Sequence, residues 1–78
     1  MKRPWLRIVA VRACVQKTGK FWLSKNRLIS VNETHISSYI AMHTSRSEAC
    51  KVANEAARAC GAAENVDVFL MKEREASR

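Results

Sequence analysis

The sequence predicts an α+β fold, in which an antiparallel sheet of three to four strands packs on one α-helix. Segments rich in β-branched and aromatic residues fill the first half of the chain, and small apolar residues recur at helical spacing after residue 45. An apolar run at 66–71 adds a last short strand, so the expected order is β-β-β-α-β. A chain of 78 residues forms one domain at most. We assign this domain to residues 1–71 and expect the charged tail, 72–78, to be frayed.

The first predicted strand covers residues 5–16, which contain four β-branched residues and neither Gly nor Pro. Residues 17–20 predict a turn, in which Gly19 is free to adopt positive φ. A second strand that starts at Phe21 then completes a hairpin. The polar stretch 24–27 predicts either a bend that breaks this second strand in two or an irregular edge.

Residues 35–43 alternate between apolar and polar side chains, which predicts a half-buried antiparallel strand. A helix follows, because Ser45 and Glu48 have the spacing of a capping box and Gly61 suits the position just after a helix. The predicted buried face consists of Ala49, Val52, Ala53, Ala56 and Cys60. The predicted exposed face consists of Lys51, Asn54, Glu55 and Arg58.

Both faces of the first predicted strand are apolar, which is typical of a strand that is covered on both sides. One helix can cover only one of them, so the other can associate with a second copy of the chain. One face holds Leu6, Ile8, Ala10 and Cys14. The candidate homodimer interface on the other face consists of Trp5, Val9, Val11 and Val15.

The net charge of +7 is distributed unevenly along the chain. Residues 1–32 contain eight Lys or Arg and no acidic residue, whereas residues 33–78 contain six basic and seven acidic residues. Such asymmetry favours an acidic partner, which can be nucleic acid, an anionic protein surface or a membrane surface, and of these we expect no membrane. The alternative is a solubilising face without a partner.

The three cysteines do not form the even, dense set of a disulfide scaffold. Cys50 and Cys60 lie on the predicted helix about 15 Å apart, too far for a disulfide. We expect Cys14, Cys50 and Cys60 to be reduced, which is typical of a cytoplasmic protein. Charged residues interrupt every apolar stretch, so we expect neither a signal peptide nor a membrane-spanning helix.

The sequence lacks a recognisable catalytic, metal or cofactor site, so we expect no enzyme activity, no metal and no cofactor. His35 and His43 lie about 26 Å apart on an extended strand and cannot share a metal ion. The cysteines do not have zinc-finger spacing, and two glycines do not make a phosphate-binding loop. A Cys–His pair that includes Cys14 stays open, although a buried cysteine in a strand is usually inert.

The segment 17–27 is the strongest candidate for binding, because it has four cations and two aromatic residues around a predicted hairpin tip. Cations can neutralise phosphates, and aromatic rings can stack on bases. Alternatively, one of Phe21 and Trp22 is a core residue and the lysines only solvate the turn. The candidate partner-binding residues are Lys17, Lys20, Trp22, Lys25, Arg27, Arg7, Arg3 and Lys2.

This plan of strands and one helix, with Trp5, Arg7, Trp22, Lys25 and Arg27 on the strands, resembles two groups of proteins. One group is the DNA-binding domains of plant ethylene-response factors and the arm-binding domains of phage integrases. The other is the very small phage-encoded inhibitors, including anti-CRISPR proteins. The resemblance is one of size and element order, and it implies strand-borne DNA contacts in the first case and a blocked host complex in the second.

We therefore expect a non-enzymatic binding module whose basic hairpin and N-terminal strand engage nucleic acid or a host nucleoprotein complex. The alternative is a homodimeric structural or assembly protein that associates through an apolar face of its sheet.

Overall fold

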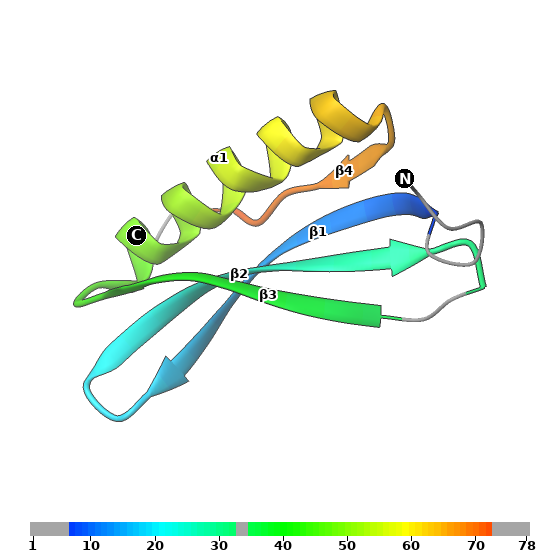
Figure 1. Ribbon diagram of the computed structural model, residues 1–78. Helices are drawn as coiled ribbons and strands as arrows, with labels where there is room; N and C mark the ends of the chain where they lie inside the picture. The colour runs from blue at the N-terminus through cyan, green and yellow to red at the C-terminus, as the bar shows by residue number, and fades with distance from the viewer. Residues whose placement is uncertain (1–6, 33–34, 73–78) are drawn as a thin grey trace.

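The computed structural model describes residues 7–32 and 35–72. It has one helix packed on a four-stranded sheet with the strand order β3-β2-β1-β4, as Figure 1 shows. The elements are β1 (Ile8–Thr18), β2 (Phe21–Ser30), β3 (His35–His43), α1 (Arg46–Glu64) and β4 (Asp67–Phe69). The α+β class and the order β-β-β-α-β that the sequence predicts are thereby confirmed.

The sheet is mixed, because β4 pairs with β1 in parallel whereas β1, β2 and β3 are antiparallel neighbours. The helix explains this difference. A helical crossover lets the strand after it run parallel to the strand before it. Because α1 connects β3 to β4, β4 has the direction of β3, which is also the direction of β1. The sheet therefore departs from the purely antiparallel one that we expected.

The hairpin between β1 and β2 turns at Gly19 and Lys20, and Gly19 has a φ of 58°. A left-handed backbone is favourable for glycine, as the sequence suggests. β2 continues through residues 24–27, so a bend that breaks the strand is wrong, but its pairing with β3 is irregular between Ser24 and Lys25. The polar side chains there are bonded to neighbouring elements: Ser24 to Ala41 of β3, and Asn26 Nδ2 to the Ala53 carbonyl of α1 at 3.1 Å.

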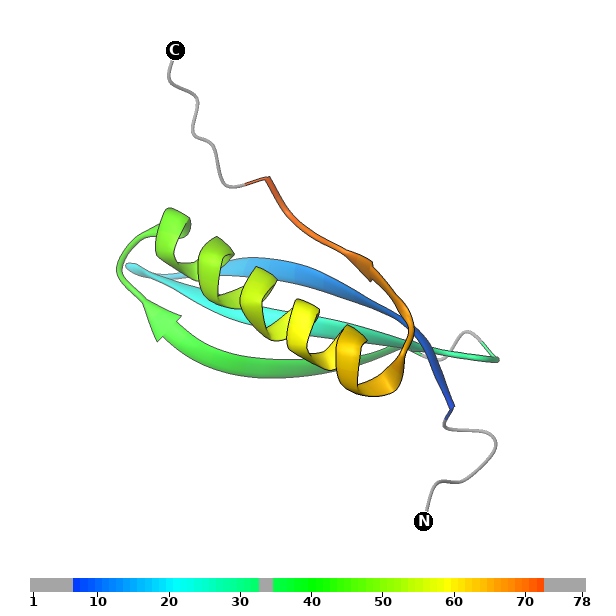
Figure 2. The same cartoon turned by 90° about the horizontal axis from the view of Figure 1, so that it is seen from above.

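β3 has the bounds that the sequence predicts, but it is exposed rather than half-buried. It is an edge strand, and α1 packs mainly over β1 and β2, as Figure 2 shows from above. A β-bulge opposite Ser24 and Lys25 shifts its register after Tyr39. The shift breaks the simple alternation of side chains that we expected along this strand.

α1 starts as predicted, since the Ser45 side chain accepts a hydrogen bond from the Glu48 N–H at 3.1 Å. It ends later than predicted, at Asn65, which has a left-handed backbone with φ of 59°. Gly61 is therefore an interior residue and not the helix end. A Cβ atom at Gly61 would collide with the side chain of Val68, so the missing side chain lets β4 lie close to α1.

The face of α1 that packs on the sheet is rotated from the predicted one. Asn54, which we expected on the surface, is 2% exposed. Its amide accepts a hydrogen bond from the Met71 N–H and donates one to the Met71 carbonyl, both at 2.8 Å. The buried residues of α1 are Ala49, Cys50, Ala53, Asn54, Ala57 and Gly61.

The core is small and lies between α1 and the two central strands. Val11 and Ala13 of β1 pack against Ala53 and Ala57 of α1. Because alanine dominates the helical side, the helix lies close to the sheet. Partly buried residues surround this cluster: Leu28, Cys60, Val66, Val68 and Met71. Within the described residues, no helix is long and apolar enough to cross a membrane.

Candidate functional site

The sheet has one face under α1 and one face that no described element covers (Figure 1). The Asn26 side chain donates a hydrogen bond to α1, so it lies on the covered face. Residues paired directly across two strands point to the same face, and neighbours along a strand alternate. The strand register therefore assigns the other side chains to a face. The open face, as we call the uncovered side, carries Ala10, Arg12, Cys14, Gln16, Thr18, Phe21, Leu23, Lys25, Arg27, Ile29, His35, Ser37, Tyr39, Met42, Asp67 and Phe69.

Two arginines face one another at the centre of this open face. Arg12 of β1 and Arg27 of β2 are direct cross-strand partners. Like charges in this arrangement cost stability. Among residues 7–32 and 35–72, neither guanidinium has a carboxylate partner. The fold thus holds two uncompensated cations together, which suits an anionic ligand.

Aromatic rings lie beside the cations on the outer strands. The Arg12 guanidinium is 5.1 Å from the ring centroid of Phe69 on β4. The Lys25 ammonium is 5.0 Å from the ring centroid of Tyr39 on β3, and 3.1 Å from Gln16 Oε1. The Tyr39 hydroxyl lies 3.5 Å from the same Gln16 oxygen, so its side chain extends from β3 over β2 towards β1. These cation–π contacts fix the rings and the cations on one surface.

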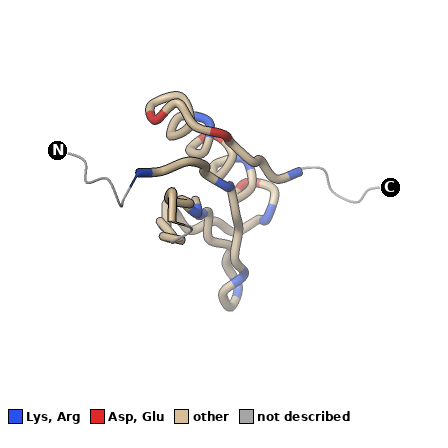
Figure 3. The backbone as a smooth tube through the Cα atoms, turned by 90° about the vertical axis from the view of Figure 1, so that its right-hand side faces the viewer, with Lys and Arg blue, Asp and Glu red and all other residues tan. Residues whose placement is uncertain are grey.

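One described acidic residue shares the open face: Asp67 of β4 is the register partner of Ala10 and lies two residues from Phe69. Glu48, Glu55 and Glu64 lie on α1 and Asp67 lies on β4, whereas the described residues of β1, β2 and β3 contain none. Figure 3 marks the acidic positions in red and the basic positions in blue along the backbone. The open face therefore carries three cations, Arg12, Lys25 and Arg27, against the single carboxylate of Asp67 at its β4 edge, so its net charge is positive.

The structure divides the predicted hairpin cluster between the two faces. Lys25 and Arg27 are on the open face, whereas Lys17 and Trp22 are on the side of α1. The Lys17 ammonium lies 5.2 Å from the ring centroid of Trp22. Trp22 is half-buried and Phe21 is exposed, which answers the question of which ring is covered.

The other predicted partner-binding residues lie away from the open-face cations or outside the described residues. Lys20 is exposed in the turn, and Arg7 precedes β1 at the end of the strand remote from that turn. Lys2 and Arg3 lie outside the described residues.

Sequence reasoning missed three residues of the open face: Arg12, Tyr39 and Phe69. Arg12 carried a signal, since it is the charged residue in the middle of an apolar strand. Tyr39 and Phe69 join it only through the pairing of β3 and β4, which the sequence does not reveal.

The four candidate dimer residues do not form an uncovered face. Val11 is fully buried against α1, and Val15 is on the same side, half-buried. Val9 is exposed at the register shift between Ile8 and Ala10, which breaks the predicted alternation. Trp5 lies outside the described residues. The helix thus covers the face that we expected to be free.

The described residues contain a Ser–His contact, between Ser24 and His43, which links β2 to β3 and is structural. Ser24 Oγ is 3.0 Å from His43 Nε2, and it also accepts a hydrogen bond from the Ala41 N–H at 3.1 Å. Ser24 is fully buried, so its hydroxyl bridges the β-bulge and is inaccessible to a substrate. No cluster of three potential metal ligands occurs in the described part of the chain.

The described cysteines are free, and Cys60 has a perturbed thiol. Burial, with a smaller effect of the Glu64 carboxylate, raises the pKa of Cys60 above its ordinary value. A raised pKa disfavours the nucleophilic thiolate. The remaining cysteines are Cys50, which is buried on α1, and Cys14, which is half-buried on the open face.

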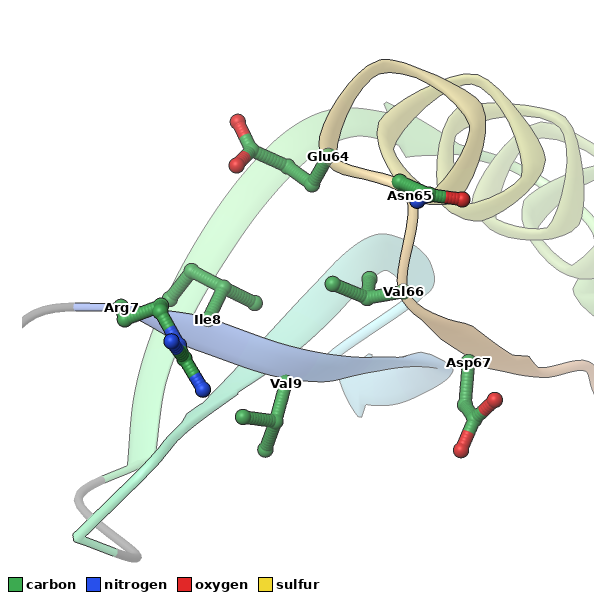
Figure 4. A pocket seen from close by; sticks show the side chains of 7 residues that line it. All are labelled: Arg7, Ile8, Val9, Glu64, Asn65, Val66 and Asp67. Atoms are coloured by element: carbon green, nitrogen blue, oxygen red, sulfur yellow. The ribbon is translucent and has the colours of Figure 1, made fainter.

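A pocket of about 440 Å³ lies where the start of β1 meets the loop between α1 and β4 (Figure 4). The carboxylates of Glu64 and Asp67 point away from one another there. Because the charged groups do not converge on one point, the pocket lacks the arrangement of a catalytic site. Its lining residues are Arg7, Ile8, Val9, Glu64, Asn65, Val66 and Asp67.

Comparison of the chain with protein-family models, with curated proteins and with solved structures finds no match. The function is therefore argued from the open face alone.

Proposed function

We propose that the protein is a non-enzymatic module that binds nucleic acid through the open face of its sheet. The observation that supports this most is the facing pair of Arg12 and Arg27, which the fold holds together without a carboxylate partner in the described residues. Phosphate groups would relieve the repulsion between the two guanidinium groups and accept their hydrogen bonds. Lys25 adds a third cation to the same surface.

The proposed site differs in part from the one expected from sequence. Its centre is the middle of β1 and β2 rather than the hairpin tip, and Lys17 with Trp22 lies on the other side of the sheet. The free cysteines fit a reducing compartment, and we place the protein in the cytoplasm as part of this proposal.

Two charge-matched variants test the proposal. In the first, Arg12, Lys25 and Arg27 are all replaced by Gln, which removes three charges from the open face. In the second, Arg46, Lys51 and Arg58 are replaced by Gln, which removes three charges from exposed positions of α1.

The assay is fluorescence anisotropy of a labelled oligonucleotide, measured between about 50 and about 200 mM salt. For the open-face variant we expect weaker binding and a salt slope that is shallower by about 2, since each lost phosphate contact lowers the slope by about 0.7–0.9. The α1 variant should bind nearly as the wild type does. Equal losses in both variants would show that net charge alone, and not the open face, attracts the nucleic acid.

Absence of binding even at low salt would refute the nucleic-acid proposal. The cations of the open face would then be assigned to an acidic protein surface, as in the phage-type inhibitors that the chain resembles in layout. A pull-down from a bacterial lysate would be the next experiment.

A second candidate function is homodimerisation, and one observation favours it. β3 is the only described element without a Lys, Arg, Asp or Glu, and it is an exposed edge strand with Ile36, Tyr39, Ile40 and Met42 accessible. Uncharged edges can pair with a second copy. Size-exclusion chromatography with light scattering should then give a dimer mass, and Ile36→Lys should reduce it to that of the monomer. A wild-type protein that stays monomeric at high concentration would refute this function.

A further inference from the structure

We propose that the ligand of the open face is single-stranded nucleic acid, with bases stacked on Tyr39 and Phe69 and phosphates bound by Arg12 and Arg27. The inference rests on the nucleic-acid function proposed above and specifies the form of the ligand. It is carried by the placement of the two rings relative to the cations.

Both rings are available to a ligand. Tyr39 is 60% exposed and Phe69 is 45% exposed. Each ring has a cation near it, Lys25 beside Tyr39 and Arg12 beside Phe69, and these contacts hold the ring against the sheet. Bases in a duplex are stacked on their neighbours, whereas a single strand can turn its bases onto aromatic side chains.

The rings and cations form a row across the sheet. Phe69, Arg12 and Arg27 are successive register partners on β4, β1 and β2. Tyr39 on β3 pairs with Lys25, two residues along β2 from Arg27. The outer strands are three spacings apart, about 14 Å, and two residues add about 7 Å along the strand, so the Cα atoms that carry the two rings lie about 16 Å apart. A single strand that crosses the sheet diagonally can place a base on each ring and pass its phosphates over the arginines between them.

The width of the sheet disfavours a duplex. The major groove of B-DNA is about 12 Å wide and admits one helix or a two-stranded ribbon. The four strands span about 14 Å between their outer backbones, before side chains are added. Since Tyr39 and Phe69 are on the two outer strands, a duplex would have to admit all four strands to its groove to contact both residues.

The first test compares the two forms of one ligand. A labelled, unstructured DNA strand of about 12 nucleotides and its duplex with the complementary strand are titrated with the full chain by fluorescence anisotropy. We expect the single strand to bind at least about tenfold more tightly than the duplex. Equal or tighter binding of the duplex, with salt dependence, would overturn this inference and leave the proposed function intact. Absence of binding to either form would overturn both.

The second test removes the rings one at a time. Tyr39→Leu and Phe69→Leu should each weaken binding of the single strand about 5- to 100-fold, because each removes the stacking of one base. The salt slope should not change, since no cation is removed. Tyr39→Phe keeps the ring and should retain the affinity of the wild type. If both Leu variants are folded by circular dichroism and bind as tightly as the wild type, the stacking assignment is refuted.

Discussion

Replacing Asn54 by Ala should destabilise the protein by about 1.5 kcal/mol. The change removes two hydrogen bonds of 2.8 Å between the Asn54 amide and the backbone of Met71. Each such bond contributes about 1 kcal/mol net. The two bonds together contribute roughly 2 kcal/mol to the free energy of unfolding. Alanine has a higher helix propensity than asparagine, and this gain offsets about 0.6 kcal/mol of that loss. Met71 is half-buried, so water can reach part of its freed backbone and the loss should not be much larger.

A loss of this size is easy to measure in so small a domain. For 78 residues the total stability is about 4–12 kcal/mol. With a urea m-value of about 1 kcal/mol/M, the unfolding midpoint should fall by about 1.5 M. Arg58→Ala, at an exposed position one turn further along α1, is the control and should leave the midpoint nearly unchanged. A loss below about 0.5 kcal/mol for Asn54→Ala would show that this amide does not anchor the segment after β4.

Two further predictions concern α1. Gly61→Ala should destabilise by about 1–3 kcal/mol, because the new Cβ meets the Val68 side chain, and Val68→Ala in the same chain should recover part of that loss in a double-mutant cycle. Additive losses would show that the two sites do not touch. The raised pKa of Cys60 means that the folded state favours the protonated thiol. The thiol therefore contributes to stability below the unfolded pKa of 9.0, and this contribution is lost as pH rises through the higher folded pKa. Alkylation of Cys60 should accordingly be slower in the folded chain than in urea at pH 9.0, and equal rates would contradict the shift.

Local patterns were sufficient where neighbouring residues decide the structure. The β-branched residues of β1, the turn at Gly19 and the cap formed by Ser45 all lie where the sequence predicts them. β3 has the predicted bounds, since alternation over nine residues is a clear strand signal. Each of these features depends on residues that are close in the chain, so the local sequence is sufficient to predict it.

Local patterns failed where distant segments meet. The sequence places the helix end too early, because Gly61 serves the packing of Val68 rather than a helix terminus. It predicts a surface position for Asn54, because the partner of this residue, Met71, lies 17 residues away. The stretch 24–27 looked like a bend, although its polar side chains are satisfied by β3 and α1.

The candidate site follows the same division. Composition and local pattern are enough to show that the first 32 residues are strongly basic and strand-forming, and to predict an acidic partner. Which cations share a surface depends on how the strands pair and where the helix packs. A single-residue bulge reverses the face of every later side chain in a strand, and the side on which α1 packs determines which face stays open. The grouping of Arg12, Arg27, Tyr39 and Phe69 is therefore a property of register and helix placement, which cross-strand contacts fix and the one-dimensional pattern does not contain.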